Sequence, residues 1–200
     1  LSNNDSGTGN TIFGYLAAGT GTISGAENNT IIGHNAGTDL TSGDQNVIVG
    51  RNAGQNITGT EDAVLIGDGA GNTMTDNVDS VVFVGRNAGY TVNDAAAAGS
   101  VGIGQNALYA LTTGARNVAL GKQALESLTV GDDNLAIGYQ AMAGFSTTDV
   151  SDKNIAIGNY AMDGVTTLAA TENVFIGYGS GGGAWTGVLS SYNVGIGNYA

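Results

Sequence analysis

The chain has 200 residues, of which 35 are Gly and none is Pro or Cys, and its 17 acidic and five basic residues give a net charge of −12 at pH 7. The lack of Pro excludes a collagen-like or Pro-rich chain, and the lack of Cys excludes disulfides and thiolate metal sites. The scarcity of Lys and Arg argues against nucleic acid and anionic membrane surfaces as partners, because phosphate groups are bound by clustered basic residues.

One short motif recurs from end to end: Asn-Val-x-Ile-Gly, followed by Ala three residues after the Gly. Variants of it occur eleven times, eight of them with the Asn and ten with the Ala, and the steps between the Gly residues are 17 to 20 residues long. The motif Gly residues are Gly14, Gly33, Gly50, Gly67, Gly85, Gly104, Gly121, Gly138, Gly158, Gly177 and Gly197. A period of this length is typical of a solenoid and leaves no separate stretch for a single-site enzyme. Residues 1–200 are therefore interpreted as a single repeat array.

Each repeat begins with a predicted β strand. β-Branched residues predominate three and one positions before the Gly, as in Val47 and Val49, and this spacing places them on one face. A corner at the Gly, a second short extended segment and a turn complete the repeat. The paired positions run from Thr11 and Phe13 in the first repeat to Val194 and Ile196 in the last.

Stacked repeats would place each strand beside its own copies, parallel and in register. The prediction is an all-β fold, a parallel β-solenoid (β-roll) of about eleven coils, forming a rod about 50 Å long at about 4.8 Å per coil. Asn stands four positions before the Gly in eight repeats, where it would form a hydrogen-bonded ladder along the axis or serve the turn. These residues are Asn10, Asn29, Asn46, Asn117, Asn134, Asn154, Asn173 and Asn193.

Two positions of the repeat vary in size together. Two before and four after the Gly stand Ile48 with Gly54, but Ala119 with Leu125, and in all ten complete repeats one member is large and the other is Ala or Gly. Two side chains that fill one space must share a fixed volume, so these columns are predicted to pack together.

If the β-branched positions face the core, strand parity puts the residue two before the Gly on the outer face. An exposed apolar column marks an interface. We therefore expect a closed oligomer, most simply a homotrimer. A monomer that folds another segment over the column is the alternative.

The motif carried by Asn117-Val118-Ala119-Leu120-Gly121-Lys122-Gln123-Ala124-Leu125 resembles the head repeats of trimeric autotransporter adhesins, and equally the repeat regions of bacteriophage tail-fibre proteins. The resemblance covers all eleven repeats, although those heads use shorter coils. It implies a left-handed parallel β-roll, three chains about one axis and a function in adhesion, and it brings no catalytic residues.

No catalytic, cofactor-binding or metal-binding residues are expected, because the acidic residues stand at differing offsets, mostly in turns. Candidate recognition residues lie in the two longest connectors and just after motif Gly residues, where Tyr would stack on sugars or act only as a β-favouring residue. They are Phe145, Trp185, Tyr192, Tyr139, Tyr160 and Tyr178.

The chain is thus predicted to be a non-catalytic structural or adhesive fibre segment, extracellular, on the cell surface or on a virion. Its partners would be further copies of itself and, as targets, cell-surface glycans or a host receptor. The alternatives are a bacteriophage tail-fibre shaft that binds host glycans and, less favoured, a polysaccharide-processing solenoid enzyme, which needs clustered carboxylates on consecutive coils. No apolar run reaches the ~20 residues of a membrane span. We also expect the array to be internal to a longer fibre protein, with a large apolar residue after Ala200 to complement Gly195.

Overall fold

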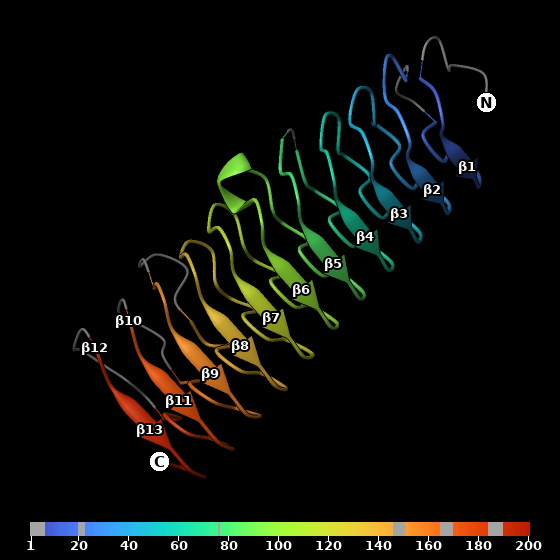
Figure 1. Cartoon of the computed structure of the whole chain (residues 1–200). Coiled ribbons are helices and arrows are strands. Elements are labelled where there is room, and N and C mark those ends of the chain that lie inside the picture. The colour runs from blue at the N-terminus through green and yellow to red at the C-terminus, as the bar shows by residue number, and fades with distance from the viewer. Residues whose placement is uncertain (1–6, 20–22, 76, 146–150, 165–169, 184–189) are drawn as a thin grey trace.

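The protein is a straight rod with the two termini at opposite ends, as the computed structural model shows (Figure 1). The structure describes residues 7–19, 23–75, 77–145, 151–164, 170–183 and 190–200. Its framework is an eleven-stranded sheet of three-residue strands. The strands are β1 (Thr11–Phe13), β2 (Thr30–Ile32), β3 (Val47–Val49), β4 (Val64–Ile66), β5 (Val82–Val84), β6 (Val101–Ile103), β7 (Val118–Leu120), β8 (Leu135–Ile137), β9 (Ile155–Ile157), β11 (Val174–Ile176) and β13 (Val194–Ile196).

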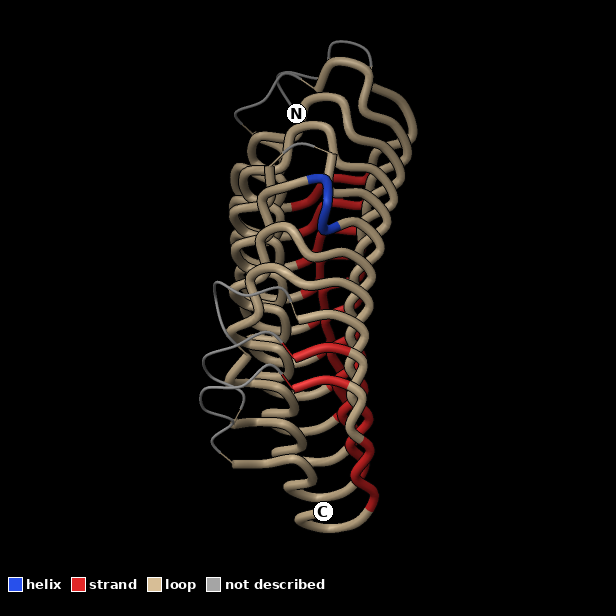
Figure 2. Tube along the Cα trace, turned by 90° about the vertical axis from the view of Figure 1, so that its left-hand side faces the viewer, coloured by secondary structure: helices blue, strands red, loops and turns tan. Residues whose placement is uncertain are grey.

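Consecutive strands of this sheet pair in parallel and in chain order, and each pairs at the same three positions of the repeat. Ile48 of β3, for example, lies opposite Leu65 of β4. The parallel β-solenoid, its strand positions and its register are therefore confirmed, with coils of about 18 residues. The tube in Figure 2 shows the strands on one side of the coils and loops closing the other sides.

Two minor elements stand outside this sheet. Strands β10 (Ala170–Thr171) and β12 (Ser190–Ser191) pair with each other in parallel in the last coils. A single 3-10 turn, η1 (Ala95–Ala97), bulges from one coil, where Asp94 caps it by accepting a hydrogen bond from the backbone N–H of Ala96 at 2.8 Å. Neither element changes the path of the solenoid.

The orientation of the strand differs from the sequence prediction. The middle residue of each strand, two before the Gly, points into the coil: Ile48, Leu65 and Ala119 are fully buried, whereas the residues on either side of them are only partly buried or exposed. The prediction that this residue forms an outer column was therefore wrong. The β-branched residues on either side of it form the outer face instead.

The two covarying positions pack on each other, as the covariation predicted, and they do so within one chain. A Cβ atom added to Gly71 would lie 2.9 Å from Cδ2 of Leu65, the partner position of the same coil. The volumes also couple between coils. A Cβ on Gly102 would lie 3.1 Å from the ring of Phe83, its neighbour in the sheet, so a Phe in this column is followed by Gly. Large residues in one column thus complement small residues in the other to fill one continuous core.

The motif Gly is required twice over. Its φ lies between 131° and 144° in all eleven repeats, a region that L side chains rarely adopt. In the first ten repeats an added Cβ would also collide with the carbonyl of the motif Gly in the next coil. This close backbone approach turns the chain sharply at the end of each strand.

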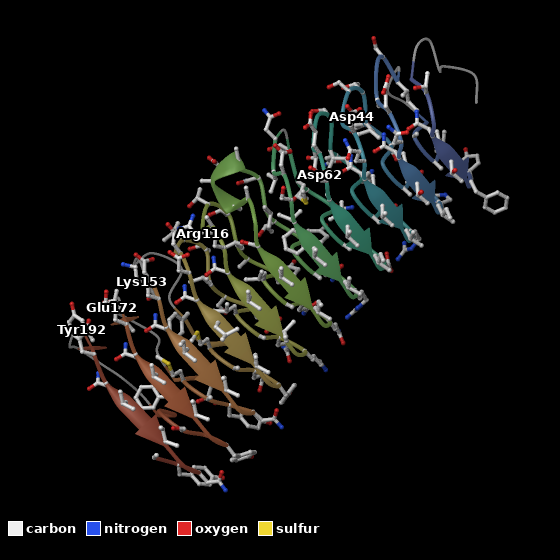
Figure 3. The ribbon with its side chains drawn as sticks, in the orientation of Figure 1. Asp44, Asp62, Arg116, Lys153, Glu172 and Tyr192 are labelled. Carbon is white, nitrogen blue, oxygen red and sulfur yellow. The ribbon has the colours of Figure 1, made fainter. Side chains whose placement is uncertain are left out.

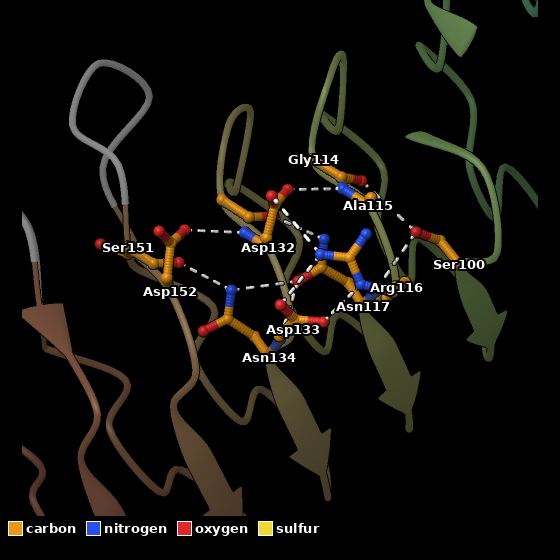
Figure 4. A network of polar contacts seen from close by, with 11 residues as sticks. Ser100, Gly114, Ala115, Arg116, Asn117, Asp132, Asp133, Asn134, Ser151 and Asp152 are labelled. Atoms are coloured by element: carbon orange, nitrogen blue, oxygen red, sulfur yellow. Dashed lines mark hydrogen bonds and ion pairs between the residues drawn. The ribbon is translucent and has the colours of Figure 1, made fainter. Parts of the chain in front are cut away.

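The Asn ladder is confirmed and is buried. Nδ2 of Asn134 donates to Oδ1 of Asn117 at 3.0 Å and to the carbonyl of Ser151 at 2.7 Å (Figure 4). Its Oδ1 accepts from the backbone N–H and Nδ2 of Asn154, both at 3.0 Å. Each amide therefore ties its own turn to the coils on both sides. Ala63 and Val81 interrupt the ladder between Asn46 and Asn117.

Candidate recognition surfaces

The outer face of the sheet carries two columns of mostly β-branched side chains along the whole rod. In the inner coils, Ile32, Ile66 and Ile103 are 37%, 36% and 41% exposed, and the terminal coils expose more, as at Ile196. Monomeric soluble proteins rarely show a continuous apolar surface of this extent. The rod therefore has an apolar surface, but it lies on the face of the strand that the sequence analysis assigned to the core.

A second surface follows the corner after the motif Gly. Four tyrosines from consecutive coils contact one another in a row: the ring centroids of Tyr139 and Tyr160 are 5.2 Å apart, those of Tyr160 and Tyr178 are 5.7 Å apart, and those of Tyr178 and Tyr199 are 5.4 Å apart. Successive rings are turned by 71° to 87°, an edge-to-face arrangement that stabilises aromatic pairs. We call these four residues the tyrosine ladder.

The tyrosine ladder alternates between two positions of the repeat. Tyr139 and Tyr178 stand one residue after their motif Gly, while Tyr160 and Tyr199 stand two residues after theirs and adopt left-handed φ values of 60° and 56°. This left-handed conformation recurs two residues after the Gly in every repeat. The corner geometry thus brings the two positions into one row.

A pocket of about 360 Å³ opens within the tyrosine ladder, lined by Tyr160, Tyr178, Tyr199, Asp163, Gly179, Gly182 and Gly183. The pocket exists because the coil of Gly177 has glycines at two positions where neighbouring coils carry side chains. Gly179 stands where the neighbouring coils carry Tyr160 and Tyr199, and Gly182 stands where the preceding coil carries Asp163. Gly179, Gly182 and Gly183 therefore leave open space beside Tyr160 and Tyr199.

Three titratable groups that line this pocket, Tyr160, Tyr178 and Asp163, are shifted toward their neutral forms. Burial, and then the neighbouring Tyr139, raises the pKa of Tyr160. The pKa of Tyr178 is raised chiefly by Tyr199 and also by burial. Burial raises the pKa of the Asp163 carboxyl. The raised pKa values keep Tyr160 and Tyr178 neutral near pH 7, so that their hydroxyl groups can both donate and accept hydrogen bonds.

A charged edge runs along another corner, five and six residues before the motif Gly, where Figure 3 places Asp44, Asp62, Arg116, Lys153 and Glu172. The interpretation that no column holds acidic residues in successive coils was wrong, since one column holds an acid in four of them: Glu27, Asp44, Glu61 and Asp79.

The aspartates six residues before the motif Gly accept hydrogen bonds from the backbone of the preceding coil. Oδ1 of Asp79 accepts from the backbone N–H of Glu61 at 2.9 Å, and Oδ1 of Asp132 accepts from that of Ala115 at 2.8 Å (Figure 4). Arg116 donates to both carboxylate oxygens of Asp133, at 2.6 and 2.9 Å, and this hydrogen bonding lowers the pKa of that carboxyl. The edge thus ties coils together, and among the described residues no group of three or more His, Cys, Asp or Glu is placed to hold a metal ion.

The six predicted recognition residues are distributed over different parts of the molecule. Tyr139, Tyr160 and Tyr178 come together in the tyrosine ladder. Tyr192 is 78% exposed but lies on the charged edge (Figure 3). Phe145 is 1% exposed and fills the core, so its prediction as a surface residue was wrong. Trp185 lies outside the described residues.

Two side chains that line the pocket, Asp163 and Tyr199, were not among the six candidate residues, although Tyr199 stands just after a motif Gly like the candidate tyrosines. The signal for Tyr199 was its place two residues after Gly197, which matches that of Tyr160 after Gly158. Asp163 gave none, because its significance depends on the absence of side chains at Gly179 and Gly182 in the next coil.

Together these features define a repeat protein of the parallel β-solenoid class. Comparison with protein-family models, with curated proteins and with solved structures finds no match for the chain. Across the described residues, no helix is both long and apolar enough to cross a membrane.

Proposed function

We propose that the chain is a non-catalytic segment of an extracellular or virion-borne fibre, in which it forms a rigid rod for attachment or display. The observation that carries the proposal is the continuous apolar face of the eleven-stranded sheet, which a second copy of the chain would cover. The resemblance of the motif to adhesin heads and tail fibres supports the same class of protein, either as a bacterial adhesin or as a bacteriophage tail-fibre shaft.

The size of the apolar face fits self-association. Eleven strands spaced by about 4.8 Å, each rising about 3.3 Å per residue over three residues, give a footprint of about 50 by 10 Å. This is of the same order as the ~800 Å² per partner buried in stable complexes. Copies related by rotation about the rod axis would close such faces into a ring, most simply a trimer.

The charged edge supports a non-catalytic role. Hydrolysis of a glycosidic bond needs two carboxyl groups free to act on one substrate. Asp44 and Asp79, two members of the acidic column, instead accept hydrogen bonds from the backbone of the preceding coil. Their role is to connect coils.

Light scattering on the purified chain tests the proposal. The expected particle mass is a multiple of 19.8 kDa, with three copies as the simplest case. Ile103→Lys combined with Ile137→Lys puts two charges on the apolar face and should give a particle of one chain that keeps its β circular dichroism.

A matched control is Gln105→Lys with Asn159→Lys, which adds the same charge one residue after the motif Gly and should leave the mass of the oligomer unchanged. A stable wild-type monomer would overturn the proposed assembly.

A further inference from the structure

We propose that the pocket in the tyrosine ladder binds a neutral oligosaccharide whose chain runs along the rod axis. The inference rests on the proposed function, since it supplies the target of an attachment fibre. The side chains of Tyr160, Tyr178, Tyr199 and Asp163 line the pocket.

The tyrosine and aspartate side chains that line the pocket suit the binding of a sugar. A pyranose ring presents a flat C–H surface that packs on an aromatic ring, and Tyr offers both such a ring and a hydroxyl group. Asp163 supplies acceptor oxygens for sugar hydroxyl groups. Glycines at 179, 182 and 183 place no side chain between the ligand and the backbone.

The shape points to an extended ligand. The tyrosine ladder continues over four consecutive coils with ring centroids 5.2 to 5.7 Å apart, so a linear chain of repeated units can follow it. The pocket volume of about 360 Å³ falls in the range of about 300–1,000 Å³ that is usual for small-molecule sites. A single quaternary ammonium group, which tyrosines and a carboxylate also attract, would fill only a small part of it.

The negative charge of the chain and of the pocket disfavours acidic sugars. The chain carries a net charge of −12, and the pocket contains Asp163 with no Lys or Arg among its lining residues. Sialylated or uronate-containing chains would be repelled at moderate ionic strength. The expected ligands are therefore uncharged hexose or N-acetylhexosamine chains.

The repeat offers a variant that fills the pocket without new backbone strain. Gly179 has a φ of 59°, and Gln123 and Gln140 occupy the same position in other coils with φ values of 62° and 54°. Gly179→Gln therefore restores the side chain that the pocket lacks, at the cost of a shift of the Tyr199 ring, which a Cβ atom would meet at 2.9 Å. Gly69→Gln is the matched control, because Gly69 stands in the same column with a φ of 69° and lines no part of this pocket.

Ligand-observed saturation-transfer NMR on the full chain tests the proposal. The probes are linear tetrasaccharides of glucose, galactose and N-acetylglucosamine, with oligosialic acid and choline chloride as charged comparisons. At least one neutral tetrasaccharide should bind the wild type, bind Gly179→Gln and Tyr160→Ala at least tenfold more weakly, and bind Gly69→Gln with unchanged affinity.

Three results would overturn the inference: binding of none of the neutral tetrasaccharides, binding of choline alone, or equal sugar binding by wild type and Gly179→Gln. The particle mass from light scattering, measured on the same samples, reports separately on the fibre proposal. A rod of the expected mass that binds no sugar would remove this site alone.

Discussion

At the scale of single residues, the motif Gly combines a backbone conformation closed to other residues with a contact that leaves no room for Cβ. Gly121→Ala should therefore lower the free energy of unfolding by roughly 3 kcal/mol or more, because the strain of its φ of 139° adds to a collision with the carbonyl of Gly138. Urea unfolding measures the loss.

The matched control for this variant is Gly99→Asn. Gly99 has a φ of 74°, its Cβ would meet only the Cγ atom of Arg116 at 3.6 Å, and Asn28 adopts a similar φ in the same column. A small change is expected. Equal losses in the two variants would show that backbone strain at Gly121 is not the cause.

The shared core volume can be tested by exchanging its two members. Leu65→Ala should cost about 2–5 kcal/mol through the cavity it leaves. Gly71→Leu should cost about 1–3 kcal/mol through overpacking. Because the double variant reproduces the arrangement of Ala119 with Leu125, it should be more stable than the sum of the single losses predicts, with a coupling energy on the order of 1–3 kcal/mol. Strictly additive losses would contradict the shared volume.

At the scale of structural elements, the buried Asn ladder connects the coils through side chains. Asn134→Ala removes both acceptor and donor, leaving the buried amide of Asn154 and the carbonyl of Ser151 without these partners. Each unsatisfied buried group costs about 1–3 kcal/mol, so a loss of several kcal/mol is expected in thermal or urea unfolding.

Asn134→Ser should cost less than Asn134→Ala, because Ser100 already stands in this column and its Oγ accepts from the backbone N–H of Asn117 at 3.2 Å. If the Ala and Ser variants unfold alike, the ladder contributes little through its hydrogen bonds.

The strands of the sheet show how much of the fold the sequence predicts. The motif predicted each strand and its register, because a backbone that repeats every coil can stack only on its own copies. It did not predict which face is buried, since both faces of the strand are apolar and hydrophobicity alone does not separate them. The covariation of Leu65 with Gly71 indicated the buried face, because a position whose size is compensated within its own coil must be enclosed.

The recognition surfaces were predictable only in part. The column of Tyr139 and Tyr178 follows from counting forward from the motif Gly, but the interleaving of Tyr160 depends on the corner geometry. The acidic column of Glu27 and Asp44 becomes visible only when positions are counted back from the next Gly, because coil length varies ahead of that point.

At the scale of the whole molecule, 17 acidic residues against five basic ones make repulsion the dominant electrostatic effect. The ion pairs between coils, such as Arg51 with Asp68 and Lys153 with Glu172, are exposed, and exposed pairs contribute only about 0–1 kcal/mol each. Meanwhile Glu27, Asp44, Glu61 and Asp79 repeat like charge along one column.

Added salt should therefore stabilise the rod. Raising NaCl from about 0.01 to 0.15 M shortens the screening length from about 30 to about 8 Å, which weakens repulsion between coils of the acidic column and across the molecule. The thermal midpoint should rise, and it should rise less in Glu61→Gln, which removes one charge from the middle of the column. Asp94→Asn, which lies outside the column, removes equal charge and should keep the wild-type dependence on salt. A midpoint that falls with salt would mean that the ion pairs between coils outweigh the repulsion.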